Sequence, residues 1–479
     1  MAPNPRRLRA MALAAIESRL ALAPEEPGLR FEQALLLDAL GRTAQAEQAY
    51  LALLRHAPGH PGALNNLGAL LNRTGRRSAA RLCYAEAARL HPEQPAGHVN
   101  LAHLLHVEGE TCSARLHYEA ALRIDPDQAE AHQGLANLLE DCGEAPAASL
   151  HRERGWRGRP LVHRPARGEG PPIRLLLLIS AQGGNLPTAP LLDETIFETH
   201  VLAAEFFDPA MPLPPHDLVV NAIGDADRCR AALAAAERVL RRTRRKVINH
   251  PALVRESGRL EVPRRLAGIP GLAVPRMALL AREGLDAPAL AARGFSFPLL
   301  LRAPGFHTGR HFLRVPDAEA LAGALAALPG ATVLAIEFRD ARGADGLCRK
   351  YRVMMIDGDL YPLHLAISPD WKVHYFIAAM AGQAELRAEE AGFLADMKHV
   401  LGARAMAALR AVRDRLGLDY GGIDFALSQS GEVLLFEANA AMAIVPPDAD
   451  PRWDYRRPAI GQAVGAARRM FAARAGSGS

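Results

Sequence analysis

The chain has 479 residues, 49% of them hydrophobic and 23% charged, an ordinary globular composition that is too long for one core and sufficient for two or three domains. The net charge of +5 comes from scattered arginines, and the densest basic run, 241–246 (RRTRRK), lacks interleaved aromatic residues, so we interpret it as a solvated helix end and expect no nucleic-acid binding. The longest purely apolar run, 175–179, is too short to cross a bilayer, so we expect no membrane span. Five widely spaced cysteines without a CxxC pair favour a reducing compartment, so we expect a cytoplasmic protein.

The first third of the sequence repeats with a period of 34 residues, which indicates a repeat architecture. Each unit predicts two amphipathic helices joined at a glycine that can take a positive φ, with a proline that ends the second helix. A small residue after the glycine lets the two helices approach closely. The repeated positions are Pro24, Pro58, Pro92 and Pro126, then Gly41, Gly75, Gly109 and Gly143, then Ala46, Ala80, Ala114 and Ala148, with Tyr50, Tyr84 and Tyr118.

This pattern resembles the tetratricopeptide repeat, whose signature positions are matched in one unit by Leu67, Gly68, Ala80, Tyr84, Ala87 and Pro92. The resemblance fades at both ends, as a capped solenoid requires. It implies an α-solenoid of helix-turn-helix repeats over 1–155, with a concave surface for a peptide or protein partner. Asn66 and Asn100 occupy equivalent positions and are candidate ligands of a peptide backbone, the alternative being that they only bond neighbouring helices.

After the repeats, residues 156–172 lose the helical period to arginine, glycine and proline, so we interpret them as a linker. Beyond it, 173–180 and 216–223 are short apolar runs typical of buried parallel strands, and 227–240 has the composition of a helix. Residues 173–250 are therefore expected to form an α/β domain.

The segment 420–439 (YGGIDFALSQSGEVLLFEAN) predicts two antiparallel strands. The simplest hairpin has a two-residue turn at Ser430-Gly431, and this register pairs Gln429 with Glu432. Counting back along both strands then places the carboxylates of Asp424 and Glu437 opposite each other.

The carboxylates of Asp424 and Glu437 and the amide oxygen of Asn439 are expected to converge, because Asn439 follows Glu437 by two residues on the same face. Opposed like charges among apolar neighbours repel and need a cation. Oxygen ligands suit magnesium. The alternative is an aspartate on the exposed face of an edge hairpin, with Asn439 as a turn residue.

The sequences GGIDFA (421–426) and FEAN (436–439) resemble the metal-binding strands of the ATP-grasp superfamily, in its glutathione synthetase ATP-binding-like form. The resemblance implies an ATP-grasp domain of two lobes over 251–472, preceded by the α/β domain and followed by a flexible tail, 473–479. In that superfamily an aspartate, a glutamate and an asparagine hold the Mg²⁺ ions that bridge the phosphates of ATP, which implies this role for Asp424, Glu437 and Asn439.

Further segments occur in the order that this superfamily requires. Arg259 is the candidate for a phosphate contact at the entry to the domain, with Arg264 and Arg265 as competitors, and a solvated surface arginine is the alternative. Arg302 ends an apolar strand where the family usually has a phosphate-binding lysine, and its planar fork can hold phosphate oxygens in bidentate fashion. The loop that follows, GFHTG, is expected to close over the phosphates with Gly305, His307, Thr308 and Gly309.

The strand before the polar linker 339–346 resembles the hinge on which the superfamily seats adenine. Glu337 is expected to contact adenine or ribose, with Phe338 beside it and Asp340 as a weaker second. The alternative is that Glu337 merely ends a strand.

A second hairpin, 349–368, turns at Asp357-Gly358, and its register pairs Arg352 with Leu363. Lys350 then shares one face with Arg352, while His364 falls on the opposite face; we interpret His364 and His374 as structural histidines. In the resembling ligases an arginine in this strand faces the γ-phosphate and the acyl phosphate, which implies a catalytic role for Arg352 together with Arg302.

The predicted function is an ATP- and Mg²⁺-dependent ligase: a small-molecule or peptide carboxylate is activated as an acyl phosphate and then converted to an amide or ester, on a substrate or partner held by the repeats. The sequence contains no P-loop, GxSxG or kinase HRD signature of a competing class. Two alternatives stay open: a nucleotide-binding pseudo-enzyme that serves as a scaffold, favoured by arginine in place of lysine at 302, and a phosphotransferase.

Overall fold

The computed structural model describes residues 5–167, 170–306, 309–373, 379–447 and 450–476. The chain forms two compact units. Unit 1 comprises residues 1–177, 181–183 and 193–216, and unit 2 comprises residues 178–180, 184–192 and 217–479. Each unit is described by itself below.

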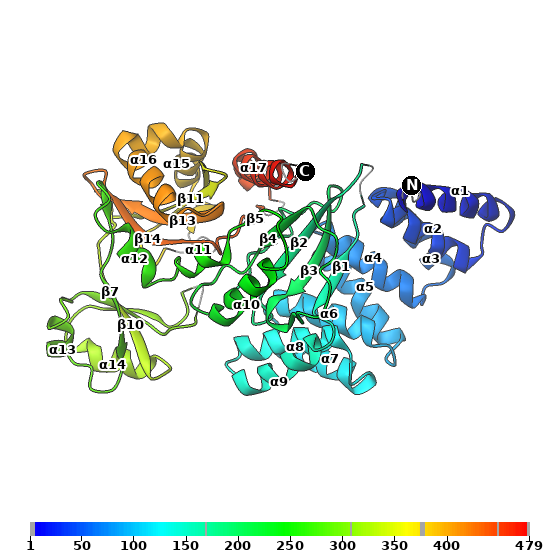
Figure 1. The fold of residues 1–479 in the computed structure, drawn as a ribbon, viewed down its shortest axis with the longest axis horizontal. Helices are drawn as coiled ribbons and strands as arrows, with labels where there is room; N and C mark the ends of the chain where they lie inside the picture. The colour runs from blue at the N-terminus through cyan, green and yellow to red at the C-terminus, as the bar shows by residue number, and fades with distance from the viewer. Residues whose placement is uncertain (1–4, 168–169, 307–308, 374–378, 448–449, 477–479) are drawn as a thin grey trace. The chain divides into compact units, whose positions relative to one another are not determined.

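Unit 1 begins with paired antiparallel helices that follow the 34-residue period (Figure 1). The glycine between the two helices of each pair has a positive φ, from +75° at Gly41 to +83° at Gly75 and Gly109, which confirms the predicted turn. The helices are α1 (Pro5–Leu22), α2 (Pro27–Ala39), α3 (Thr43–His56), α4 (Pro61–Arg73), α5 (Arg77–Leu90), α6 (Pro95–Val107), α7 (Thr111–Ile124), α8 (Ala129–Asp141) and α9 (Ala145–Trp156).

The repeated alanines and tyrosines form the core of this helical part. Ala46, Ala80, Ala114 and Ala148 are fully buried, and Tyr50, Tyr84 and Tyr118 pack in the same cluster at 0–4% exposure. The small alanine side chains allow the close helix approach that the sequence predicts, and the tyrosines fill the space between successive helices.

Gly68 of α4 is expected to accept no larger residue, because a Cβ there would lie 2.5 Å from the ring of Tyr84, which is 4% exposed and cannot move aside. Gly68→Ala should lower the free energy of unfolding by about 1–3 kcal/mol, measured by urea denaturation of the full chain. Gly323 in α14 (Ala320–Ala327) is the matched control, since apart from its chain neighbours and the backbone of its own helix no described atom lies within 4 Å of its Cβ position. Gly323→Ala should leave stability unchanged or raise it by about 0.5–1 kcal/mol, and equal losses in the two variants would contradict this packing argument.

Unit 1 continues into a sheet whose first strand was expected to be linker. The predicted linker 156–172 is wrong in part, because Trp156 is buried at the end of α9 and β1 (Leu161–Arg164) pairs antiparallel with β3 (Phe197–Ala203). Strand β3 lies between β1 and β2 (Ile173–Ile179), whose residues 173–177 belong to unit 1, and is followed by the short helix η1 (Ala204–Phe206). The Arg167 guanidinium, also in the expected linker, forms ion pairs with Asp38 (2.7 Å) and Glu194 (2.8 Å).

Unit 2 contains the parallel pair β4 (Leu218–Asn221) and β5 (Val247–Ile248), and two further sheets. A four-stranded antiparallel sheet has the order β7-β10-β8-β9, with β7 (Met277–Ala281), β8 (Leu299–Arg302), β9 (Phe312–Val315) and β10 (Thr332–Glu337). A five-stranded mixed sheet has the order β12-β11-β13-β14-β6, with β6 (Leu272–Ala273), β11 (Cys348–Ile356), β12 (Asp359–Ser368), β13 (Tyr420–Leu427) and β14 (Val433–Asn439).

Helices cover the mixed sheet: α15 packs on β12 and α17 on β11 and β12. The predicted tail 473–479 is wrong over 473–476, because α17 continues to Gly476, with Arg474 paired to Asp357 and Asp419. The helices of unit 2 besides α14 are α10 (Arg230–Leu240), α11 (Pro251–Arg255), α12 (Glu261–Leu266), α13 (Ala287–Ala291), α15 (Ala384–Ala395), α16 (Met397–Leu416) and α17 (Arg457–Gly476), with 3-10 turns η2 (Ala379–Gly382) and η3 (Pro451–Arg456).

The fold class is thus a helical-repeat solenoid followed by an α+β region with mixed sheets. Over the described residues, every helix is too short or too polar to span a bilayer.

Candidate functional site

Unit 2 contains a cavity of about 520 Å³, a size within the range of small-molecule sites. Both of its larger sheets contribute lining residues: β8 and β10 of the antiparallel sheet, and β11, β12, β13 and β14 of the mixed sheet. The segments after β4, before α12 and after β14 also contribute lining residues. Polar groups from distant parts of the chain therefore meet in one concave space.

The hairpin of β13 and β14 brings Asp424 opposite Glu437, which confirms the predicted pair. The predicted two-residue turn is wrong, however. The loop has three residues, Gln429, Ser430 and Gly431, with Gly431 at φ +74°, and the Ser428 backbone N–H donates to the Glu432 carbonyl. A bulge between Asp424 and Phe425 then shifts the register by one residue and restores the pairing of the two carboxylates.

The Asp424 side chain is fully buried and neutralised by two cations. One Asp424 oxygen lies 2.6 Å from Arg352 Nε, and the other accepts from Arg352 Nη2 at 2.8 Å and lies 2.6 Å from Lys350 Nζ. Burial alone would raise the pKa of Asp424, but Arg352 and Lys350 outweigh it and hold that pKa far below its ordinary value. Likewise, burial opposes the charge of Arg352, and Asp424 raises the Arg352 pKa above its usual range. Asp424 is therefore a buried carboxylate, not the exposed one that the alternative required.

A second bulge corrects the predicted surroundings of Arg352. The pairing of Ile356 with Asp359 begins the hairpin of β11 and β12 as expected, but the register shifts between Arg352 and Val353, so that His364, not Leu363, lies opposite Arg352. The prediction that His364 faces away is therefore wrong, and His364 lines the cavity. Burial, followed by Arg352, lowers the pKa of His364 well below its ordinary value, which keeps the imidazole neutral.

Glu437 and Asn439 lie at the end of β14, on the same face as predicted. Asn439 Nδ2 donates to Glu437 Oε1 at 2.9 Å, and Arg259 Nη2 donates to the same oxygen at 3.3 Å. Asn439 Oδ1 accepts from the backbone N–H of Ala441. The structure thus brings Arg259 to the expected metal ligands.

Of the three arginines considered at the entry to the domain, Arg259 alone lies among the residues that line the cavity. Arg264 is 74% exposed and pairs with Glu261 on α12. Arg265 donates to the backbone carbonyl of Arg415 at 2.7 Å, away from the lining residues. The helix α12 turns both of these side chains outward.

Arg302, at the end of β8 as predicted, lines the cavity and is largely buried. Its Nη2 donates to the Phe306 carbonyl, and its guanidinium carbon lies 5.6 Å from the ring centroid of Phe312. Its buried Nε has no hydrogen-bond partner among the described residues. Burial, followed by repulsion from Arg259, lowers the pKa of Arg302 to about 10. An anion in the cavity would satisfy this cation.

Glu337 ends β10 and lines the cavity together with Phe338. Glu337 Oε2 accepts from the backbone N–H of Arg276 at 3.0 Å, and Phe338 stacks under the guanidinium of Arg314 at 4.6 Å. Asp340 lies outside the lining residues, because both of its oxygens are held by the Arg342 side chain on the surface.

The expected phosphate loop is only partly described. Gly309 lines the cavity at φ +74°, whereas Gly305, at φ +80°, does not. His307 and Thr308, and likewise His374, lie outside the described residues.

The two asparagines of the repeats lie on the first helices of their pairs, Asn66 on α4 and Asn100 on α6, and both are half-buried. The Asn100 amide donates to the side chain of Asn65 on the neighbouring α4 at 3.0 Å. Asn66 interacts with Tyr50 of α3. Both asparagines therefore contact neighbouring helices in this structure, which was the alternative interpretation of these residues.

The cavity contains more charge than the sequence predicted. The lining residues that the structure describes include six cationic and five acidic side chains: Arg259, Arg302, Arg339, Lys350, Arg352 and Lys372, and Asp225, Asp227, Glu337, Asp424 and Glu437. Asp225 and Asp227 were not predicted, although they directly follow a predicted parallel strand, and the carboxyl ends of such strands are where ligands bind. Lys372 was not predicted either, because no local pattern marks it.

No family model matches the chain, and no curated protein matches it either. Solved structures of helical-repeat proteins do match: MamA 41-end from Desulfovibrio magneticus RS-1, at 17% identity over 30% of this chain and 81% of that chain, with a TM-score of 0.28. PilF of Pseudomonas aeruginosa matches at 21% identity over 31% and 68%, with a TM-score of 0.30. YrrB, a TPR protein, matches at 16% identity over 31% and 77%, with a TM-score of 0.28. These scores are too low to carry an argument, so the likeness of the repeats to tetratricopeptide repeats rests on their period and paired helices.

Proposed function

We propose that the cavity of unit 2 binds ATP with Mg²⁺, and that the chain is an ATP-dependent ligase of the ATP-grasp class acting on a carboxylate. The observation that carries the proposal is Arg302, a buried cation whose Nε has no partner among the described residues, in a cavity shared with Arg352 and Lys350. A desolvated cation of this kind gains most from a charged oxygen ligand, and an arginine fork suits phosphate oxygens.

The arrangement of the two sheets supports this proposal. A cavity that receives side chains from an antiparallel sheet and from a mixed sheet agrees with the two-lobed domain that the GGIDFA and FEAN segments imply. Cations from both sheets, Arg302 and Arg352, line the same space, so a polyphosphate could bridge them. Glu337 and Phe338, at the end of β10, would lie beside the adenosine part.

The residues present fit a magnesium ion once two side chains rearrange. Glu437 supplies carboxylate oxygens, which magnesium prefers, whereas Asn439 faces Glu437 with its Nδ2 and would have to turn its Oδ1 away from the Ala441 N–H. Asp424 is occupied by Arg352 and Lys350, and it becomes available only if those cations turn to phosphate oxygens. Bound there, the ion would neutralise the phosphates of ATP.

In this proposal the protein contributes positioning and charge rather than a nucleophile. Arg352 is charged at all physiological pH values, and once it turns from Asp424 to the phosphate oxygens it stabilises the negative charge that develops as the γ-phosphoryl group passes to the substrate carboxylate. The resulting acyl phosphate loses phosphate when an amine or hydroxyl attacks its carbonyl carbon. Neutral His364, opposite Arg352, adds no charge to compete with the phosphates. The repeats would hold a peptide or protein that carries or accepts the acyl group.

Arg302→Met is expected to weaken ATP binding by about 10-fold to 100-fold, because charge-assisted hydrogen bonds contribute roughly 1.5–3 kcal/mol. The same change should leave the melting temperature unchanged or raise it, because a buried cation without a full set of partners is replaced by an apolar side chain. Isothermal titration of the full chain with ATP and Mg²⁺ measures the first effect, and scanning calorimetry measures the second.

Arg264→Met is the matched control, since Arg264 is 74% exposed and lies outside the cavity lining. It should change neither quantity. Equal ATP affinity in the Arg302 variant and the wild type would sink the proposed nucleotide site. ADP release by the wild-type chain, with and without candidate carboxylates and amines, separates a ligase from a scaffold, which releases none, and from a phosphotransferase, which leaves a stable phosphorylated product.

A further inference from the structure

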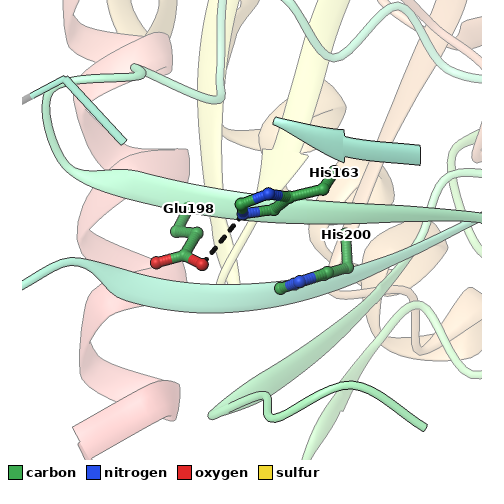
Figure 2. Close-up of side chains that lie close together, drawn as sticks. All are labelled: His163, Glu198 and His200. Carbon is green, nitrogen blue, oxygen red and sulfur yellow. Dashed lines mark hydrogen bonds and ion pairs between the residues drawn. The ribbon is translucent and has the colours of Figure 1, made fainter. Parts of the chain in front are cut away.

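A group of metal-ligand side chains lies in unit 1, on the sheet formed after the repeats. His163 of β1 and His200 of β3 are directly opposite each other in the antiparallel register, and Glu198 precedes His200 by two residues on the same face of β3. One ligand atom of each of the three lies within 4.8 Å of the others. Figure 2 shows the two imidazoles and the carboxylate on adjacent strands, with Glu198 directed towards His163.

The contacts within this group leave binding capacity unused. His163 Nε2 lies 3.0 Å from a Glu198 oxygen, and the two imidazoles stack with centroids 4.6 Å apart. The Nδ1 atom of His200 is buried and has no hydrogen-bond partner among the described residues. A buried polar atom without a partner is rare in native structures and points to a bound water or ion.

We propose that His163, Glu198 and His200 bind a divalent transition-metal ion, with zinc as the fitting representative. Two imidazole nitrogens and one carboxylate oxygen form a ligand set that zinc accepts, with water in the remaining position. The His163 side chain is 48% exposed, and that of Glu198 is 25% exposed, so an ion can enter from solvent. This site belongs to unit 1 and does not depend on the nucleotide proposal for unit 2.

Coordination requires one ring movement. The two imidazole planes are stacked, 18° from parallel, so their in-plane lone pairs lie in two separate planes and do not converge on one ion. Rotation about χ2, which is a broad torsion for histidine, turns the His200 ring edge-on towards the position between His163 and Glu198. The ion would then replace the present contact between His163 and Glu198.

The group includes one acidic side chain. The single carboxylate of Glu198 offsets part of the charge of the ion, as in other two-histidine, one-glutamate sites.

The test uses the full chain, stripped of metal by dialysis against chelator and then titrated with Zn²⁺, or with Co²⁺ as a visible probe. The wild type should retain a single equivalent of zinc by mass spectrometry and should develop the absorption of four- or five-coordinate Co²⁺. His163→Gln/His200→Gln should retain none and develop no such band. Glu198→Gln, which keeps the side-chain shape, should weaken binding by at least about 10-fold to 100-fold, the range seen even for residues that only support metal ligands.

A matched control is provided by another histidine pair, His98 and His117 of the repeats, whose Nδ1 atoms lie 3.0 Å apart. His98→Gln/His117→Gln should bind zinc as the wild type does. Circular dichroism checks that each variant is folded, and the Glu198 variant keeps the test valid if the double variant is not. The proposal is overturned if the wild type retains no zinc, if the His163/His200 variant retains as much as the wild type, or if only the control variant loses it.

Discussion

Replacement of Asp424 by asparagine is expected to lower the free energy of unfolding by about 3–5 kcal/mol, the usual cost of removing one partner of a buried ion pair. The asparagine would keep the shape of the side chain but not its charge. Arg352 and Lys350, both mostly buried, would then lie within hydrogen-bond distance of a neutral group. The variant should also lose ATP binding if the nucleotide proposal holds, because the arrangement of both cations depends on Asp424.

Scanning calorimetry of the full chain measures this loss as a decrease of several degrees in the melting temperature of unit 2. The Asp424 pKa lies far below its ordinary value of about 3.9, so the carboxylate contributes fully above about pH 4, and its contribution is lost as the pH falls further. The difference in melting temperature between wild type and variant should therefore be constant from neutral pH to about pH 5 and should decrease in stronger acid.

Asp340→Asn is the matched control, because Asp340 is an exposed carboxylate paired with Arg342 outside the cavity lining. The Asp340→Asn variant should have nearly the same melting temperature and ATP affinity as the wild type. Combining Asp424→Asn with Lys350→Met should recover part of the lost stability, since one of the two unbalanced cations is removed. A double variant less stable than Asp424→Asn alone would contradict the charge explanation.

The second large effect is expected at Arg456, which anchors the segment before α17. Glu390 is 0% exposed and accepts from Arg456 at 2.6 and 3.0 Å, from the Tyr455 hydroxyl at 2.5 Å, and from the Leu365 backbone at 3.2 Å. Arg456→Met should cost about 3–5 kcal/mol of stability, because it leaves this carboxylate charged and buried without its cation. Denaturant unfolding of the full chain, followed by circular dichroism, measures the loss.

Arg457 provides a control one residue away, since its ion pair with Asp454 has side chains 46% and 60% exposed. Arg457→Met should change stability by about 0–1 kcal/mol. The double variant Glu390→Gln/Arg456→Met should be more stable than Arg456→Met, because replacing both members of a buried pair by neutral groups removes the unbalanced charge. Equal losses of unfolding free energy in Arg456→Met and Arg457→Met would contradict the explanation that burial makes the Arg456–Glu390 pair important for stability.

The helical repeats were predictable because their information is local. Each unit contains its own glycine turn, its terminating proline and its buried alanine and tyrosine, so the 34-residue period fixes helix pairs such as α4–α5 without any knowledge of distant contacts. The pair of Asp424 and Glu437 was also reached by counting from a turn. The predicted two-residue turn was wrong, but the pairing was correct because the three-residue loop and the bulge shift the register by one residue in opposite directions.

Register beyond such bulges could not be read from the sequence. A single extra residue at Leu363 turned His364 from the predicted outer face to the side of Arg352, since a one-residue shift reverses every side chain beyond it. For the same reason the sequence did not predict the group of His163, Glu198 and His200 in unit 1. His163 lies in a stretch with the composition of a linker, and its partner His200 is 37 positions away on β3.

The sequence by itself therefore determined the repeated helices and the existence of both hairpins in unit 2, because propensity, turn chemistry and periodicity act over a few residues. It also showed which charged residues these hairpins contain. The tertiary structure decided which of those residues meet. It buried Asp424 between Arg352 and Lys350, left Arg302 Nε without a described partner, and placed His163 against His200. The physical reason is that strand pairing and burial depend on contacts between distant segments, which set both the register and the charge that each side chain can keep.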